Sequence, residues 1–173
     1  MKNIFFDMDF TIVNSIELLV DGELGTQKYK TERGWFKKLK PYKNIELLND
    51  LARNGNVWIL SNSPTEQADF DKNWWLDMYI PNIPVTKRIF NRGAIAANKT
   101  KAQVAMEVLG RKLTVNDILF DDAIENCKDW EKAGGRAILK TTRIKNDCLN
   151  AGKVWNGETV ARLSTIARRI TAV

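Results

Sequence analysis

Short apolar runs alternate with amphipathic helical patterns over most of this 173-residue chain. Runs of this length, without polar alternation, are typical of strands buried on both faces of a sheet. Strands are predicted at 3–6, 57–60, 85–90, 117–120 and 136–139, and helices at 42–54, 65–79, 100–109, 123–133 and about 158–170. Alternating strands and helices predict an α/β fold: a Rossmann-like parallel sheet with helices on both faces.

The bulk properties fit one soluble domain spanning residues 1–173. The chain is 44% apolar and 28% charged, which is ordinary for a globular protein. No apolar run approaches the roughly 18 residues that span a bilayer. The first apolar stretch is interrupted by Asp7 and Asp9, unlike a signal peptide. We therefore expect a cytoplasmic protein with no membrane partner.

The chain contains no histidine and has a net charge of +6. The lack of histidine excludes imidazole-based acid–base catalysis, histidine-containing triads and histidine-ligated metal sites. The positive charge favours anionic partners, namely phosphates, nucleotides or nucleic acid. A solvated basic surface would explain the same charge without any partner.

Carboxylates and hydroxyls follow three of the predicted strands. In a parallel α/β sheet, the carboxyl ends of the strands meet at one edge, where ligands bind. Asp7 and Asp9 are two residues apart, so they leave the first strand on the same side. Such a cluster of negative charge suits a divalent cation with hard oxygen ligands, which indicates Mg²⁺. The residues at the three strand ends are Asp7, Asp9, Thr11, Ser61, Asn62, Asp121 and Asp122.

Two lysines, Lys99 and Lys101, lie at the start of the helix that precedes the fourth strand. If Asn98 is the N-cap, they occupy the first and third helical positions. Either lysine could neutralise a phosphate, and Lys99 is the preferred candidate. Together with the strand-end residues, a lysine completes a set suited to phosphoryl transfer.

At this point the chain resembles the haloacid dehalogenase (HAD) superfamily of phosphatases. The resemblance rests on four short motifs in the right order, and it covers about residues 1–140. The motifs are Asp7-x-Asp9-x-Thr11, Leu60-Ser61-Asn62, the lysine of Asn98-Lys99-Thr100-Lys101, and Asp121-Asp122 followed by Asn126. The sequences of residues 120–127, 34–41 and 58–61 are most similar to the 5'(3')-deoxyribonucleotidase branch.

The resemblance implies a role for each matched residue. Asp7 would be the nucleophile that forms an aspartyl-phosphate, and Asp9 would be the general acid and then the general base. Mg²⁺ would be held by Asp7, the main-chain carbonyl of Asp9 and Asp122. At position 10 the family often has glycine or another small residue, whereas this chain has Phe10.

The resemblance assigns phosphate binding to Ser61 and Asn62, and charge neutralisation to Lys99. Two matched residues have alternative interpretations. Asp121 either binds the metal through water or supports its neighbour Asp122. Asn126 either orients the metal shell or caps a helix.

The expected function is a Mg²⁺-dependent phosphomonoester hydrolase acting on nucleoside monophosphates. A small cap insertion is expected at about residues 15–40. The alternatives are a phosphatase of nucleic-acid ends or phosphoproteins, and a non-catalytic nucleic-acid-binding module with the same fold.

Overall fold

The described part of the chain is built on a five-stranded parallel sheet. A computed structural model describes residues 2–15, 32–43, 45–92 and 99–140. The strand order is β5-β4-β1-β6-β7, and every neighbouring pair is parallel. This confirms the predicted fold class. The predicted helix at 158–170 lies outside the described residues. The strands are β1 (Asn3–Phe6), β4 (Asn56–Asn62), β5 (Arg88–Asn91), β6 (Asp117–Asp121) and β7 (Arg136–Leu139).

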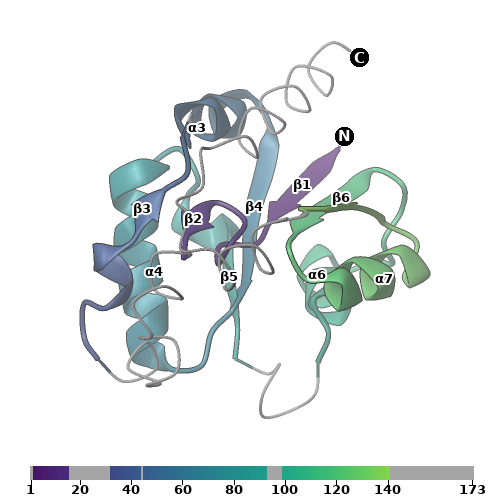
Figure 1. Cartoon of the computed structure of the whole chain (residues 1–173). Helices are drawn as coiled ribbons and strands as arrows, with labels where there is room; N and C mark the ends of the chain where they lie inside the picture. The colour runs from purple at the N-terminus through teal and green to yellow at the C-terminus, as the bar shows by residue number, and fades with distance from the viewer. Residues whose placement is uncertain (1, 16–31, 44, 93–98, 141–173) are drawn as a thin grey trace, which may run out of the picture.

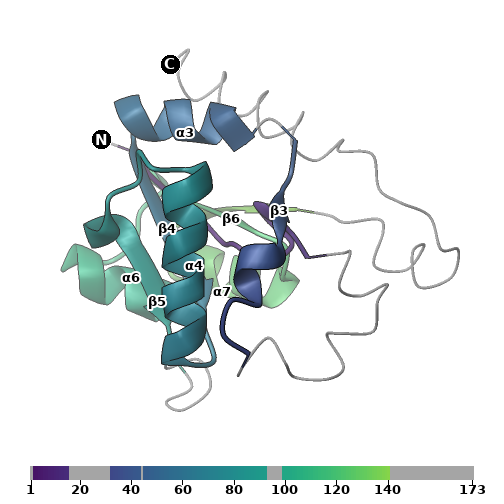
Figure 2. The ribbon, with the colours of Figure 1, turned by 90° about the vertical axis from the view of Figure 1, so that its left-hand side faces the viewer.

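Helices cover both faces of the sheet (Figures 1 and 2). One face packs α3 (Ile45–Asn54) and α4 (Glu66–Tyr79), and the other packs α6 (Lys101–Leu109) and α7 (Ile124–Lys132). Alternate residues of β1 therefore enter different cores: Phe6 joins the first, and Phe5 joins the second. Within the described ranges, no helix is both long and apolar enough to cross a membrane.

The strand order reverses at β1, which pairs with β4 on one side and β6 on the other. Phe6, the last residue of β1, is in register with Ile59 of β4 and Phe120 of β6. The residues that follow these three positions therefore emerge at one edge of the sheet. This is the switch point at which open α/β sheets bind their ligands.

A short antiparallel ribbon, absent from the predicted strands, flanks the expected insertion at 15–40. It pairs β2 (Val13–Asn14) with β3 (Lys40–Pro41). Residues 16–31 of the insertion lie outside the described residues. The described part of the insertion that precedes β3 includes the 3₁₀ helix η2 (Phe36–Lys38), which packs against α4. The indole of Trp75 donates a hydrogen bond to the Leu39 carbonyl over 2.9 Å.

Two predicted elements begin three residues later than expected. The helix predicted from residue 42 begins at Ile45, because the Tyr42 amide still donates to the Ile12 carbonyl over 3.2 Å. The strand predicted at 85–90 begins as a 3₁₀ helix, η3 (Val85–Lys87), and only then becomes β5. Both errors lie at the start of an element, where a local turn competes with the regular structure.

At the opposite end of the sheet, a buried carboxylate holds several elements together. Asp117, at the start of β6, is fully buried and accepts hydrogen bonds from Asn3 at 2.6 Å and Thr114 at 2.8 Å. Arg111 donates to both of its oxygens at 2.7 and 2.8 Å. Burial alone would raise the pKa of Asp117, but the hydrogen bonds from Arg111, Asn3 and Thr114 hold it well below its usual range.

Replacing Asp117 by Asn should lower the free energy of unfolding by about 2–3 kcal/mol at pH 7, because it removes charge-assisted bonds from a buried group. The folded-state pKa is depressed, so this contribution is present above the unfolded pKa of about 4 and declines as the pH falls below it. Urea denaturation at pH 7 and pH 3 measures both effects. The exposed Asp50→Asn variant on α3 is the control, and an equal loss in the two variants would contradict the prediction.

Candidate active site

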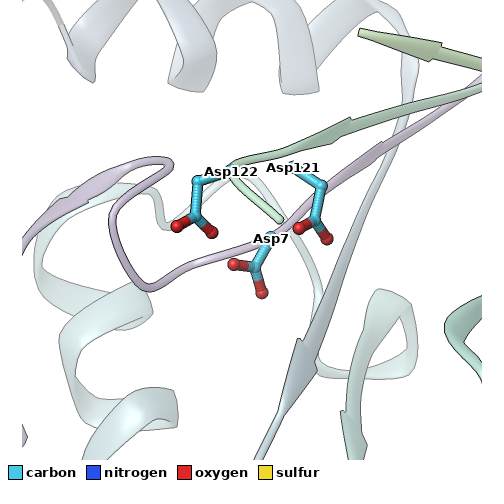
Figure 3. Close-up of side chains that lie close together, drawn as sticks. All are labelled: Asp7, Asp121 and Asp122. Atoms are coloured by element: carbon cyan, nitrogen blue, oxygen red, sulfur yellow. The ribbon is translucent and has the colours of Figure 1, made fainter. Parts of the chain in front are cut away.

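Three carboxylates converge at the switch point. Asp7 follows β1, while Asp121 ends β6 and Asp122 follows it. One oxygen of each carboxylate lies within 4.8 Å of the others, and Figure 3 shows the side chains turned toward one another. Asp7 and Asp121 are buried, whereas Asp122 is partly exposed. The structure thus brings together the two strand ends that were predicted to meet.

A buried lysine stabilises this cluster. The ammonium group of Lys101, on the first turn of α6, lies 2.7 Å from Asp7 and 2.6 Å from Asp121. Burial would lower the pKa of Lys101, but the two carboxylates outweigh it and the net pKa is raised. Lys101 therefore carries a charge that offsets two buried carboxylates at once.

The structure places Lys99, the lysine preferred from the sequence, away from the carboxylate cluster. Lys99 lies on the surface, where its ammonium group pairs with Glu107 at 2.9 Å. The reason is the helix start: Thr100, not Asn98, is the N-cap, and it forms a capping box with Gln103. Lys101 thus becomes the first helical residue and points to the carboxylates, while Lys99 lies outside the helix.

The geometry favours a supporting role for Asp121. One oxygen accepts from Lys101, and the other accepts from the Ala123 amide at 2.9 Å and the Asn126 side chain at 3.0 Å. Asn126 does not cap α7, whose N-cap is Ala123 without a side-chain hydrogen bond. It instead orients Asp121, which places the neighbouring Asp122 at the rim of the cluster.

The Asp9 carboxylate lies outside the three-carboxylate cluster and contacts a lysine that was not predicted. Lys72 of α4 is buried, and its ammonium group lies 2.8 Å from Asp9 and 2.9 Å from the Ser61 hydroxyl. It also donates to the Asn62 main-chain carbonyl at 2.8 Å. The Asn62 side chain is exposed, and its oxygen accepts from Asn91 at 3.1 Å.

A third buried lysine, Lys140, supports the loop that follows Asp9. Its side-chain nitrogen donates to the main-chain carbonyls of Phe10 and Thr11 and lies 3.5 Å from the Tyr42 ring centroid. Burial lowers the pKa of Lys140 to about 6, although Asp122 and Asp7 oppose the shift. The Thr11 hydroxyl is itself buried without a hydrogen-bond partner among the described residues.

Both additional lysines left a signal in the sequence. Lys140 directly follows a predicted strand, so inspection of that strand end would have placed it at the same edge. Lys72 lies on the buried side of α4 with Ala68, Trp75 and Leu76. A charged residue within an apolar helical stripe is rarely buried without a partner. The position of Lys72 in this stripe therefore makes it a candidate for a buried ion pair.

The charges fit a divalent cation. Around the site, four carboxylates face two ion-paired lysines, and at neutral pH Lys140 adds little positive charge. The pKa of Asp121 is raised by burial and then by the charge of Asp7, with Lys101 opposing both. Uncompensated negative charge among hard oxygen ligands is what Mg²⁺ binding relieves.

Comparison with solved structures gives the fold. A HAD-superfamily hydrolase from Ehrlichia chaffeensis aligns with a TM-score of 0.55 and 15% identity, over 80% of this chain and 88% of its own. A HAD family enzyme from Bacteroides thetaiotaomicron aligns with a TM-score of 0.54 and 16% identity, over 86% and 98%. This chain has the HAD-like fold.

The similarity is confined to structure. No family model matches the sequence, and no curated protein matches it either. A structure of the wild-type Bacteroides enzyme in complex with magnesium and inorganic phosphate also aligns, with a TM-score of 0.52 and 13% identity over 90% of this chain and 98% of that one. At such identities the comparison establishes the HAD-like fold and leaves the nucleotidase branch as a prediction.

Within the HAD-like fold, Phe10 occupies a position with unusual backbone geometry. Its φ angle is +55°, the left-handed region that glycine adopts at little steric cost. The carbonyl of Phe10 accepts a hydrogen bond from Lys140. The lysine thus helps to hold a bulky residue in a conformation that it would otherwise avoid.

Replacing Lys101 by Met should lower the free energy of unfolding by about 3–5 kcal/mol, because Asp7 and Asp121 would remain buried without a counter-charge. The matched Lys99→Met variant removes only an exposed ion pair and should cost less than about 1 kcal/mol. Urea denaturation in excess chelator compares the two. Similar losses in the two variants would mean that Lys101 does not compensate the charges of Asp7 and Asp121.

Lys140→Met tests the buried amine. Because the folded-state pKa of Lys140 lies near 6 and the unfolded value near 10.4, the unfolded chain binds more protons between these values. The free energy of unfolding of the wild-type protein, minus that of the variant, should therefore rise from pH 7 to pH 9 by at most about 1.4 kcal/mol per pH unit. Urea denaturation in chelator at pH 7, 8 and 9 measures this difference. Exposed Lys128→Met is the control, and a pH-independent difference for Lys140→Met would contradict the prediction.

Proposed function

We propose that this protein is a Mg²⁺-dependent phosphomonoester hydrolase that acts through an aspartyl-phosphate. The observation that carries the proposal is the position of Asp7. Its buried carboxylate lies at the switch point, 2.7 Å from the Lys101 ammonium and within the cluster formed with Asp121 and Asp122. A carboxylate so placed is oriented and charge-balanced, as a nucleophile toward a phosphate must be.

In the first step, Asp7 attacks the phosphorus atom. Lys101 contacts Oδ1 of Asp7, which leaves Oδ2 for the new oxygen–phosphorus bond. The bond from phosphorus to the leaving oxygen breaks, and Asp9 gives that oxygen a proton. The Asp9 side chain is 37% exposed, so a leaving group can reach it from the solvent side. The Ser61 hydroxyl binds a phosphate oxygen during this step.

In the second step, Asp9 takes a proton from water and the water oxygen attacks phosphorus. The bond between Asp7 and phosphorus breaks, releasing inorganic phosphate and restoring the carboxylate. Using one group first as acid and then as base is consistent with general acid–base catalysis. When bound by Asp7, Asp122 and the Asp9 carbonyl, Mg²⁺ supplies positive charge that reduces repulsion between the nucleophile and the phosphate.

The substrates that we propose are nucleoside monophosphates. Support comes from the paired aspartates at the end of β6 and from the resemblance of residues 120–127 to the deoxyribonucleotidase branch. The positive net charge of +6 also suits an anionic substrate. Phosphorylated ends of nucleic acids and phosphoproteins are the alternative substrates. A binding module without catalysis is the alternative function.

Replacing Asp7 by Asn should abolish hydrolysis of para-nitrophenyl phosphate, because an amide does not form the phosphoenzyme. Wild-type protein should be active with Mg²⁺ and inactive in excess chelator. Initial rates of para-nitrophenol release measure both effects. The exposed Asp129→Asn variant on α7 should keep wild-type activity.

A panel of substrates then separates the alternatives. Higher kcat/KM for nucleoside monophosphates than for phosphorylated oligonucleotides or phosphopeptides supports the nucleotidase proposal. Turnover of Asp7→Asn within a few-fold of wild type removes Asp7 as the nucleophile. Nucleic-acid binding without hydrolysis of any substrate favours the non-catalytic module.

A further inference from the structure

The ammonium group of Lys72 joins two separate parts of the proposed active site. It reaches from the middle of α4 to Asp9 after β1 and to Ser61 and Asn62 at the end of β4. Lys72 is only 2% exposed. A lysine is buried this deeply only when acceptors replace its lost hydration, and here three acceptors lie within 2.9 Å.

The three contacts use all the donors of the ammonium group, which has three N–H groups and no acceptor. The Ser61 oxygen therefore accepts from Lys72, and its single hydroxyl proton is left for another group. Among the described residues, that proton has only a long contact of 3.4 Å to the Asn62 carbonyl. Lys72 thus orients the Ser61 hydroxyl as a donor toward an arriving anionic oxygen.

The same ammonium group fixes the orientation of Asp9. It binds Oδ2 and leaves Oδ1 for proton transfer. The Phe36 ring lies 5.0 Å from the ammonium group and packs beside it. The lysine of this ion pair is buried, whereas the Asp9 side chain is partly exposed. Lys72 therefore contacts Asp9 from the protein interior and leaves its other side facing the solvent.

We propose that Lys72 is a positioning residue that sets the acid/base carboxylate of Asp9 and the phosphate-binding hydroxyl of Ser61 in one fixed arrangement. This inference rests on the function proposed above. Lys72 contacts both Asp9, which protonates the leaving oxygen, and Ser61, which binds a phosphate oxygen. One lysine therefore sets the relative position of these two groups. The reaction depends strongly on such alignment, since small displacements of reacting groups lower rates about 100-fold.

The test exploits the basicity of the leaving group. An alkyl phosphate needs a proton from Asp9 for departure, whereas para-nitrophenolate leaves with little help. Lys72→Met should lower kcat/KM at least about 100-fold for an alkyl phosphate and less than about tenfold for para-nitrophenyl phosphate. The exposed Lys128→Met variant is the control and should leave both values unchanged.

A double-mutant cycle separates positioning from a merely structural role. If Lys72 acts on leaving-group departure through Asp9, then Lys72→Met in an Asp9→Asn background should add no more than the roughly tenfold loss expected from Ser61, well below the loss of about 100-fold in the wild-type background. Multiplicative losses, or equal losses for the two substrates in Lys72→Met, would overturn the proposal. If Lys72→Met does not fold, Lys72→Arg keeps the charge but not the three-acceptor geometry, and should show the same dependence on the leaving group.

A binding measurement keeps this inference distinct from the proposed function. Calorimetric titration with inorganic phosphate and Mg²⁺ should show about tenfold weaker binding for Lys72→Met, because the Ser61 donor is no longer oriented. The additional Ser61→Ala change should then add little. If the wild-type protein hydrolyses no phosphomonoester, the proposed function fails, and unchanged phosphate affinity in Lys72→Met then overturns the Lys72 assignment as well.

Discussion

The ion pairs that Lys101 makes with Asp7 and Asp121 are the interaction on which the site depends. Two buried carboxylates at adjacent strand ends repel each other, and their burial is unfavourable without a counter-charge. The first position of a helix is electrostatically unfavourable for a lysine, because the helix dipole already places positive charge there. The buried carboxylates outweigh that effect, so a lysine is stable at the first position of α6, where the capping box of Thr100 and Gln103 places it.

The two lysines that pair with Asp7 and Asp9 come from opposite faces of the sheet. Lys72 belongs to α4, which packs on one face, and Lys101 belongs to α6, which packs on the other (Figure 1). Both lysines reach the residues that follow β1, because β1 is the central strand and its carboxyl end is accessible from both faces of the sheet. A histidine-free site can therefore still hold Asp7 and Asp9 in separate environments, each with its own cation.

Much of this arrangement follows from the sequence. The run 3–6 predicts β1 and hence the position of Asp7, and the same reasoning places Ser61 and Asp121 at one edge. The choice between Lys99 and Lys101 depends on the cap of α6: Thr100 and Gln103 form a capping box, which places Lys101 rather than Lys99 beside the carboxylates. Side-chain direction depends on which residue begins the helix, and an error of two residues turns a buried cation into an exposed one.

Other features could not be predicted from local pattern alone. The contact between Lys72 and Asp9 joins residues 63 positions apart, and it exists only once α4 is packed on the sheet. The same is true of Lys140, which lies 130 positions from Phe10. Long-range contacts of buried charges are decided by tertiary packing, so the sequence shows candidate residues but not their partners.

The β2–β3 ribbon has a consequence for how proteins of this architecture diversify. Asn14 pairs with Lys40, so the two ends of the intervening segment are held together apart from the ladder of the central sheet. The entropy of closing a flexible loop grows only slowly, by about 0.6 kcal/mol for each doubling of its length. Insertions and deletions between the two strands can therefore accumulate over evolution at little cost to the core, while the clustered carboxylates of Asp7, Asp121 and Asp122 remain in place.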